Sequence, residues 1–130
     1  MNRQIKFRAW DKTYSLMNYK VQVGNTDYAD QNYTCNSIWV DYGDNKSVGW
    51  MNADDKCVGL MQFINSHDRN GKVIYESDLL KAPSGLICEV FWNEYELRWS
   101  MKNRNDIYNI NCQILEVVGN RFENPELLQP

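Results

Sequence analysis

The segment from Gly59 to Lys81, GLMQFINSHDRNGKVIYESDLLK, decides the fold of this chain. Its first half is largely apolar, and its second half is an extended run that ends at the acidic corner Glu76-Ser77-Asp78. The sequence Asp68-Arg69-Asn70-Gly71 separates the two halves, and Asn-Gly supplies the positive backbone dihedral angles that a tight turn requires. The segment therefore predicts two β-strands that are joined by a turn and followed by a corner.

Alternation of apolar and polar residues extends this pattern on both sides of the central segment. Ile5, Phe7 and Ala9 alternate with Lys6 and Arg8, which is the pattern of a strand with one solvated face. The extended run after it is expected to return as the second strand of a hairpin. The strands expected outside the central segment span residues 5–9, 15–23, 37–40, 48–51, 86–92, 94–102 and 110–118.

The clearest alternation lies between Glu94 and Lys102, where one face is apolar and the other polar. This pattern predicts a half-buried antiparallel strand. Its apolar face holds Tyr95, Leu97, Trp99 and Met101. Near the C-terminus, Asn124 can cap a helical turn and Pro125 suits its first position, so one such turn is expected. The polar segment 24–36 fits both a long loop and a short helix over 27–32.

Turn signals at intervals of 8–12 residues predict a mainly β fold, with an α+β arrangement left open. A chain of 130 residues forms one domain or two small modules that share a core. About five strands are expected between residues 59 and 122, which is the number for a small barrel whose closure hides the sheet edges. We therefore predict a β-rich N-terminal region over residues 1–58 and a C-terminal barrel over residues 59–130.

Composition and charge argue against several classes of protein. The hydrophobic fraction of 43% is enough for a folded interior. No run of about 18 apolar residues occurs, so no membrane-spanning helix is expected. The first residues, Met1 to Arg8, lack the apolar segment of a secretion signal. The net charge of −3 provides no general positive face for nucleic acid.

The four cysteines and the single histidine do not predict a metal site. No two cysteines form the Cys-x-x-Cys pair typical of zinc sites, and His67 is the only imidazole. We expect the cysteines to be small buried apolar residues in a reducing compartment. These are Cys35, Cys57, Cys88 and Cys112. Asp41, Asp44 and Asn45 around Gly43 lack the alternate spacing of a calcium loop, so a solvated turn is expected there.

No arrangement of residues predicts catalysis. Glu76 and Asp78 are the best carboxylate pair, and they can bind a cation, act as an acid and a base, or accept hydrogen bonds from backbone amides at a turn. The structural alternative is favoured. His67 lies between Ser66 and Asp68, but adjacent residues cannot form a catalytic triad. The remaining acidic pairs, Asp54-Asp55 and Glu94/Glu96, are expected on the solvated surface. We therefore predict no enzymatic activity, no cofactor and no catalytic or metal-binding residue.

One hairpin combines basic and aromatic residues and leaves nucleic-acid binding as an alternative. Small barrels can stack bases on aromatic rings and follow the phosphate backbone with Arg and Lys. The residues concerned are Arg98, Trp99, Lys102, Arg104 and Tyr108. Alternation places Trp99 on the apolar face, and nearby acidic residues weaken the positive field. Nucleic acid is therefore a possible partner that is not favoured.

Three segments together resemble the YopX family of phage and prophage proteins. They are Lys6-Phe7-Arg8-Ala9-Trp10-Asp11, then Leu60-Met61-Gln62-Phe63 with Asp68-Arg69-Asn70-Gly71-Lys72 and Ile74-Tyr75-Glu76-Ser77-Asp78, and finally residues 116–128, EVVGNRFENPELL. They keep the order of the family and span both ends of the chain. Ser77 stands where the family usually has Gly, so a positive φ at this position would strain the backbone.

The resemblance implies an N-terminal β-hairpin region packed on a C-terminal SH3-like barrel. It also implies a homo-oligomer and a phage gene product in the cytoplasm of the bacterial host cell. It supplies no reaction and no functional residues. We therefore predict a non-enzymatic phage accessory protein of unknown biochemical activity that self-associates and binds an unidentified host or phage protein. Tyr and Trp beyond what a small core can bury are typical of such interfaces.

Overall fold

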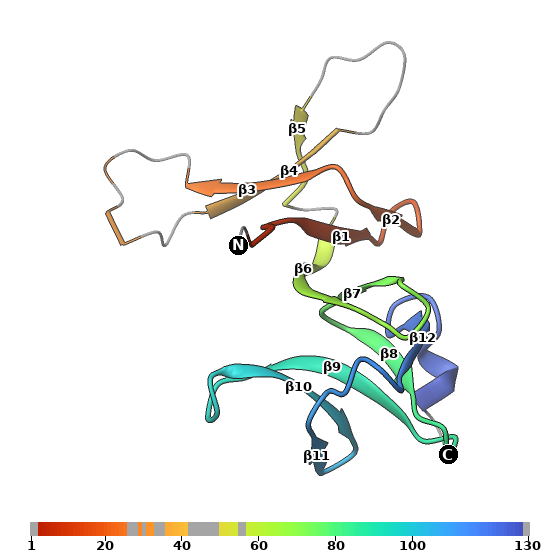
Figure 1. The fold of residues 1–130 in the computed structure, drawn as a ribbon. Coiled ribbons are helices and arrows are strands. Elements are labelled where there is room, and N and C mark those ends of the chain that lie inside the picture. Colours follow the sequence, from red (N-terminus) through yellow and green to blue (C-terminus); the bar gives the residue numbers. More distant parts are fainter. Residues whose placement is uncertain are drawn as a thin grey trace. The chain divides into compact units, whose positions relative to one another are not determined.

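The computed structural model describes residues 3–25, 29, 31–32, 36–41, 50–54 and 57–128 (Figure 1). Within these ranges the chain is almost entirely β, with twelve strands and one short 3-10 helix. The prediction of a mainly β fold is confirmed. The chain forms two compact units, Lys6–Met61 and Met1–Ile5 with Gln62–Pro130. The boundary expected between residues 58 and 59 stays a prediction.

The N-terminal unit contains two antiparallel groups of strands. β1 (Phe7–Asp11) and β2 (Leu16–Asn18) form the hairpin that alternation predicts, with Ala9 opposite Asn18. The second group has the order β3-β4-β5. Its strands are β3 (Val21–Asn25), β4 (Asn36–Asp41) and β5 (Trp50–Asn52). Of the segment that fits a loop or a helix, residues 29, 31 and 32 are turns, and the rest of 27–32 lies outside the described residues.

The core of the N-terminal unit is small. Ala9, Val40 and Ala53 are fully buried, and partly buried Val21, Ile38 and Leu60 pack against them. β6 (Cys57–His67) begins in this unit and continues into the other. The central segment Gly59–Lys81 therefore belongs to both units through one continuous strand.

The C-terminal unit is built on a five-stranded antiparallel sheet of order β11-β10-β9-β8-β12, whose curling makes it barrel-like (Figure 1). The strands are β8 (Asp78–Lys81), β9 (Ile87–Asn93), β10 (Arg98–Asn103), β11 (Asp106–Tyr108) and β12 (Glu116–Asn120). The second half of β6 pairs with β7 (Val73–Tyr75), with Phe63 opposite Tyr75.

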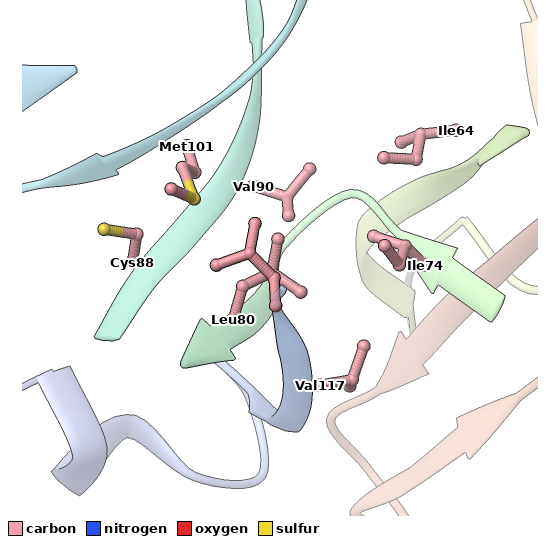
Figure 2. Close-up of a cluster of buried hydrophobic side chains, with 8 residues drawn as sticks. Ile64, Ile74, Leu80, Cys88, Val90, Met101 and Val117 are labelled. Carbon is pink, nitrogen blue, oxygen red and sulfur yellow. The ribbon is translucent and has the colours of Figure 1, made fainter. Parts of the chain in front are cut away.

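The main core lies against one face of this sheet. Figure 2 shows Ile64, Ile74, Leu80, Cys88, Val90, Met101 and Val117 gathered together, and Leu115 completes the cluster. These side chains come from β6, β7, β8, β9, β10, β12 and the residue before β12. Burial of such branched and sulfur-containing side chains supplies most of the free energy that favours folding.

The expected helical turn near the C-terminus is present as a 3-10 helix, η1 (Pro125–Leu128). Pro125 is its first residue, as expected. Asn124 precedes it, as expected, and its carbonyl accepts a hydrogen bond from the N–H of Leu127, while its Oδ1 atom accepts one from the N–H of Asn120. Among the residues that the structure describes, no helix has the length and apolar character needed to cross a membrane.

Two strand predictions for the C-terminal unit were wrong in part. The strand expected from Glu94 begins only at Arg98, because Asn93 Oδ1 accepts hydrogen bonds from the N–H groups of Tyr95 and Glu96 and closes a turn. Tyr95 is 93% exposed and Leu97 is 74% exposed, so neither contributes to the apolar face expected of them.

The strand expected over residues 110–118 begins only at Glu116, since residues 112–114 form a turn. Asn111 closes this turn, with its Oδ1 atom accepting from the N–H of Gln113 and its carbonyl from the N–H of Ile114. Besides β9, the strand that pairs with β10 is β11, which follows a turn at Arg104 and Asn105 and was not predicted.

Candidate functional site

Asp68 is a buried carboxylate that organises the turn between β6 and β7. Its Oδ1 atom accepts hydrogen bonds from the N–H groups of Asn70 (2.9 Å) and Lys72 (2.8 Å). Its Oδ2 atom accepts from the N–H of Val117 in β12 at 2.9 Å. Burial raises the pKa of Asp68, but these three bonds and the positive charge of Lys72 outweigh it, so the pKa lies below its ordinary value. The carboxylate is thus a structural link.

The acidic corner at residues 76–78 forms a second link. Asp78 is buried, and its Oδ2 atom accepts a hydrogen bond from the N–H of Tyr75 at 2.8 Å. Ser77 has a φ of 70°, and its N–H donates to the carbonyl of Val90. Its own carbonyl accepts from the N–H of Arg121. The corner therefore connects β8 to β9 and to the turn after β12.

Glu76 is half-buried next to β6. The N–H of Gln62 donates to its Oε1 atom at 3.4 Å. Burial raises the pKa of Glu76, the bond from Gln62 opposes this effect, and the negative charge of Glu89 raises the pKa further. Both members of the best carboxylate pair thus accept hydrogen bonds from backbone amides, and they contact different strands.

The turn after β12 is the third link. Asn120 Oδ1 accepts hydrogen bonds from the N–H groups of Phe122 (3.0 Å) and Glu123 (2.9 Å). An added Cβ atom at Gly119 would lie 2.6 Å from Cγ of Asn124, so only glycine fits beside that side chain. Arg121 pairs with Glu89 of β9 at 3.3 Å. The central and C-terminal motifs that carry the family resemblance therefore hold the strands together.

The strain at Ser77 gives a testable result. Replacing Ser77 with Gly is expected to raise the free energy of unfolding by about 0.5–1 kcal/mol, because glycine adopts a positive φ without a steric penalty. Ser77→Ala is the matched control, since it keeps the Cβ atom and should bring no such gain. Urea denaturation of the three proteins measures the difference. Equal stability of the Gly and Ala variants would show that the backbone here is unstrained.

Three exposed residues of the C-terminal unit with large apolar or aromatic side chains share one hollow. The hollow has a volume of about 560 Å³, and Tyr95, Ile107 and Tyr108 line it together with the polar Asn93, Glu96, Arg98 and Asn109. We name these residues the β10–β11 surface. Ile107 is 56% exposed, and its strand β11 is one of the two edge strands of the sheet. An edge strand offers unpaired backbone groups to another chain.

The charges of this surface neutralise each other. Arg98 donates to both carboxylate oxygens of Glu96 (2.8 and 3.2 Å) and to Oδ1 of Asn109 at 2.6 Å. Lys102 lies over the ring of Phe91, with 4.9 Å between Nζ and the ring centroid. Arg98 and Lys102, two of the three basic residues considered for nucleic-acid contact, therefore already interact with other side chains of the protein.

The aromatic members of that hairpin also have other roles. Trp99 is half-buried at the edge of the main core, and its ring meets the ring of Trp92 edge-on at 5.2 Å. Tyr108 lies on the edge strand β11, while Arg104 lies in the turn before it. The structure therefore does not gather the five residues into one basic and aromatic face.

The remaining sequence candidates do not form a site. His67 is exposed at the end of β6 with its ring against Phe63. Cys88 is in the core, where burial raises its pKa, and Cys112 is half-buried. Cys35 and the side chain of Cys57 lie outside the described residues. In the part of the chain that the structure describes, His, Cys, Asp and Glu nowhere gather in groups of three.

The other acidic candidates take part in local structure. Asp54 accepts a hydrogen bond from the N–H of Ile38 at 2.6 Å, which is the main cause of its lowered pKa. Asp41 forms an ion pair with Lys20, with 4.0 Å between Oδ2 and Nζ. Glu94 is exposed in a turn. Asp55 and the calcium-like residues Gly43, Asp44 and Asn45 lie outside the described residues.

Sequence reasoning missed the β10–β11 surface, because it assigned Tyr95 to the core and Ile107 to no strand. It also missed Asp68 as a buried link. A usable signal was present for Asp68, since Asp two residues before Asn-Gly is well suited to accept backbone hydrogen bonds within a turn.

Comparisons with known proteins agree with this architecture. The family model described as YopX protein matches residues 6–129. No curated protein gives a match. The crystal structure of protein EF1440 from Enterococcus faecalis is similar, with a TM-score of 0.66 and 23% identity over 98% of this chain and 100% of that chain. At this level of identity the similarity shows a shared fold.

Proposed function

The chain belongs to the YopX protein family, and from this premise we propose that it is a phage or prophage accessory protein that works by self-association and protein binding. It acts in the bacterial cytoplasm and catalyses no reaction. The observation that carries the proposal is the β10–β11 surface, where Tyr95, Ile107 and Tyr108 are exposed around a hollow. Exposed aromatic residues of this kind are typical of protein interfaces.

The partner that the properties of this surface favour is a second copy of the chain. The charge of Arg98 is matched by Glu96 within the same surface, so two identical surfaces can meet without repulsion between like charges. Contact between identical surfaces around a two-fold axis is the commonest form of homo-oligomer. The exposed edge strand β11 adds backbone groups that can pair across such an axis.

Replacing Ile107 with Lys tests the proposal. A charge at the centre of an apolar contact must be desolvated, so we expect the dissociation constant for self-association to rise by about tenfold or more. Sedimentation equilibrium at several concentrations measures this constant. The matched control is Ile114→Lys, which changes an exposed isoleucine outside the hollow. A wild-type chain that is monomeric at micromolar concentration would contradict self-association.

Nucleic-acid binding is the alternative. Arg104 is the only basic residue of the proposed hairpin, among those that the structure describes, for which no pairing is seen. Retention of the protein on DNA or RNA that weakens steeply with salt would favour this alternative. No retention at low salt would remove it.

A further inference from the structure

A second hollow of the C-terminal unit, of about 390 Å³, lies apart from the residues of the β10–β11 surface. Arg3, Gln62, Glu76, Trp92 and Trp99 line it. Two tryptophans and a carboxylate thus face one space, although they come from the β9–β10 hairpin and from the corner after β7. We name these five residues the tryptophan cleft.

The sheet explains why the two tryptophans lie together. Trp92 of β9 is directly opposite Trp99 of β10. Residues two apart on a strand share one face, so both rings lie on the face that carries Val90 and Met101 of the core. Their planes meet at 72°, with 5.2 Å between the ring centroids. The two ring planes are therefore nearly perpendicular, both tryptophans line the hollow, and Trp92 remains 44% exposed.

The strained corner places the carboxylate beside these walls. The N–H of Ser77 donates to the carbonyl of Val90, two residues before Trp92. The carbonyl of Gln62 accepts from the N–H of Glu76, and the N–H of Gln62 donates to its carboxylate. Glu76 is therefore held to Gln62 through both its backbone N–H and its carboxylate, and it lines the cleft. Strained backbone that fixes a side chain is common at binding sites.

We propose that the tryptophan cleft binds an organic cation, namely a guanidinium or alkylammonium group. The faces of aromatic rings attract cations, and indole is the strongest such ring. A carboxylate at the same place adds charge-assisted hydrogen bonds. The nearby charge of Glu89 makes the surroundings of Glu76 more negative. The protein already holds Lys102 over Phe91 by the same kind of contact.

Arg3 supplies the cleft with an internal competitor. The backbone of Gln4 is held to the Asn65 side chain by two hydrogen bonds of 2.9 Å, one in each direction. This pair fixes the backbone next to Arg3, which lines the cleft. A bound cation would be repelled by the guanidinium of Arg3, so removing that charge should strengthen binding.

Titration with butylguanidinium tests the proposal, with the uncharged butylurea as the matched probe. The ¹⁵N–¹H signals of the Trp92 and Trp99 indole groups are expected to shift and saturate with butylguanidinium alone. Trp92→Leu and Glu76→Gln should each weaken binding by about fivefold or more, and Arg3→Gln should strengthen it by about threefold. Trp50→Leu, a change in the other unit, should have no effect. Equal shifts with butylurea, or no saturable shift, would overturn the proposal.

A short peptide with one central arginine identifies the source of the cation. Binding of this peptide at least as tight as that of butylguanidinium supports a protein side chain as the ligand. Binding of butylguanidinium alone supports a small free cation. The Ile107→Lys variant separates this proposal from the proposed function, because it should lose self-association and keep the tryptophan cleft.

Discussion

Replacing Asp68 with Ala is expected to lower the free energy of unfolding by about 3 kcal/mol. The change leaves the N–H groups of Asn70, Lys72 and Val117 without their acceptor. Each lost hydrogen bond to a charged group is worth about 1.5–3 kcal/mol, but water can satisfy the two N–H groups in the exposed turn, so the sum is smaller. Asp68→Asn should have an intermediate effect, since it keeps one carbonyl oxygen. Urea denaturation measures both.

The same carboxylate makes stability depend on pH. The pKa of Asp68 in the folded state is lower than its ordinary value of 3.8. The carboxylate therefore makes its full contribution to the free energy of unfolding when the pH is above 3.8. The contribution is lost as the pH falls through the lower folded value. The wild type should therefore lose more stability than the Asp68→Ala variant when acidified through this range. Asp106→Asn, at an exposed residue of β11, is the control. Parallel stability curves for wild type and Asp68→Ala would contradict this role.

Replacing Leu80 with Ala is expected to lower the free energy of unfolding by about 3 kcal/mol. Leu80 is fully buried in the centre of the main core (Figure 2). Its strand β8 is hydrogen-bonded to β9 on one side and β12 on the other, so the backbone cannot move to fill the cavity that the substitution leaves. The lost apolar burial and the cavity both contribute, and such changes cost about 2–5 kcal/mol.

Leu97→Ala is the matched control for Leu80, because it removes the same atoms from a side chain that is 74% exposed. We expect a change within about 0.5 kcal/mol. Thermal unfolding followed by circular dichroism measures both variants. A similar loss in both would show that the core is not centred on β8.

Local pattern was enough to predict several elements of the fold. The hairpin of β1 and β2 follows from alternation, and Pro125 marks the start of η1. Alternation failed at Ile110 to Ile114, because a period of two does not show whether a partner strand exists. Asn111 instead accepts hydrogen bonds within a local turn. Asn93 likewise accepts a hydrogen bond from the N–H of Tyr95 within a local turn, so Tyr95 lies on the surface and not in the core where alternation placed it.

The links between strands could be predicted only in part. The absence of the usual glycine at Ser77 pointed to a strained position, and its φ of 70° agrees. The bond from Val117 to Asp68 joins residues 49 positions apart, so no local pattern could reveal it. Trp92 and Trp99 become neighbours only through the register of β9 and β10.

Hydrogen–deuterium exchange of the wild-type chain at low and high protein concentration tests the central claim most directly. If the β10–β11 surface mediates self-association, exchange at Tyr95 to Arg98 and at Asp106 to Tyr108 should slow as the concentration rises. The turn of Asp68 to Gly71, which holds the fold, should exchange at the same rate in both samples. Unchanged exchange at the β10–β11 surface, or slowing confined to another part of the chain, would contradict the account.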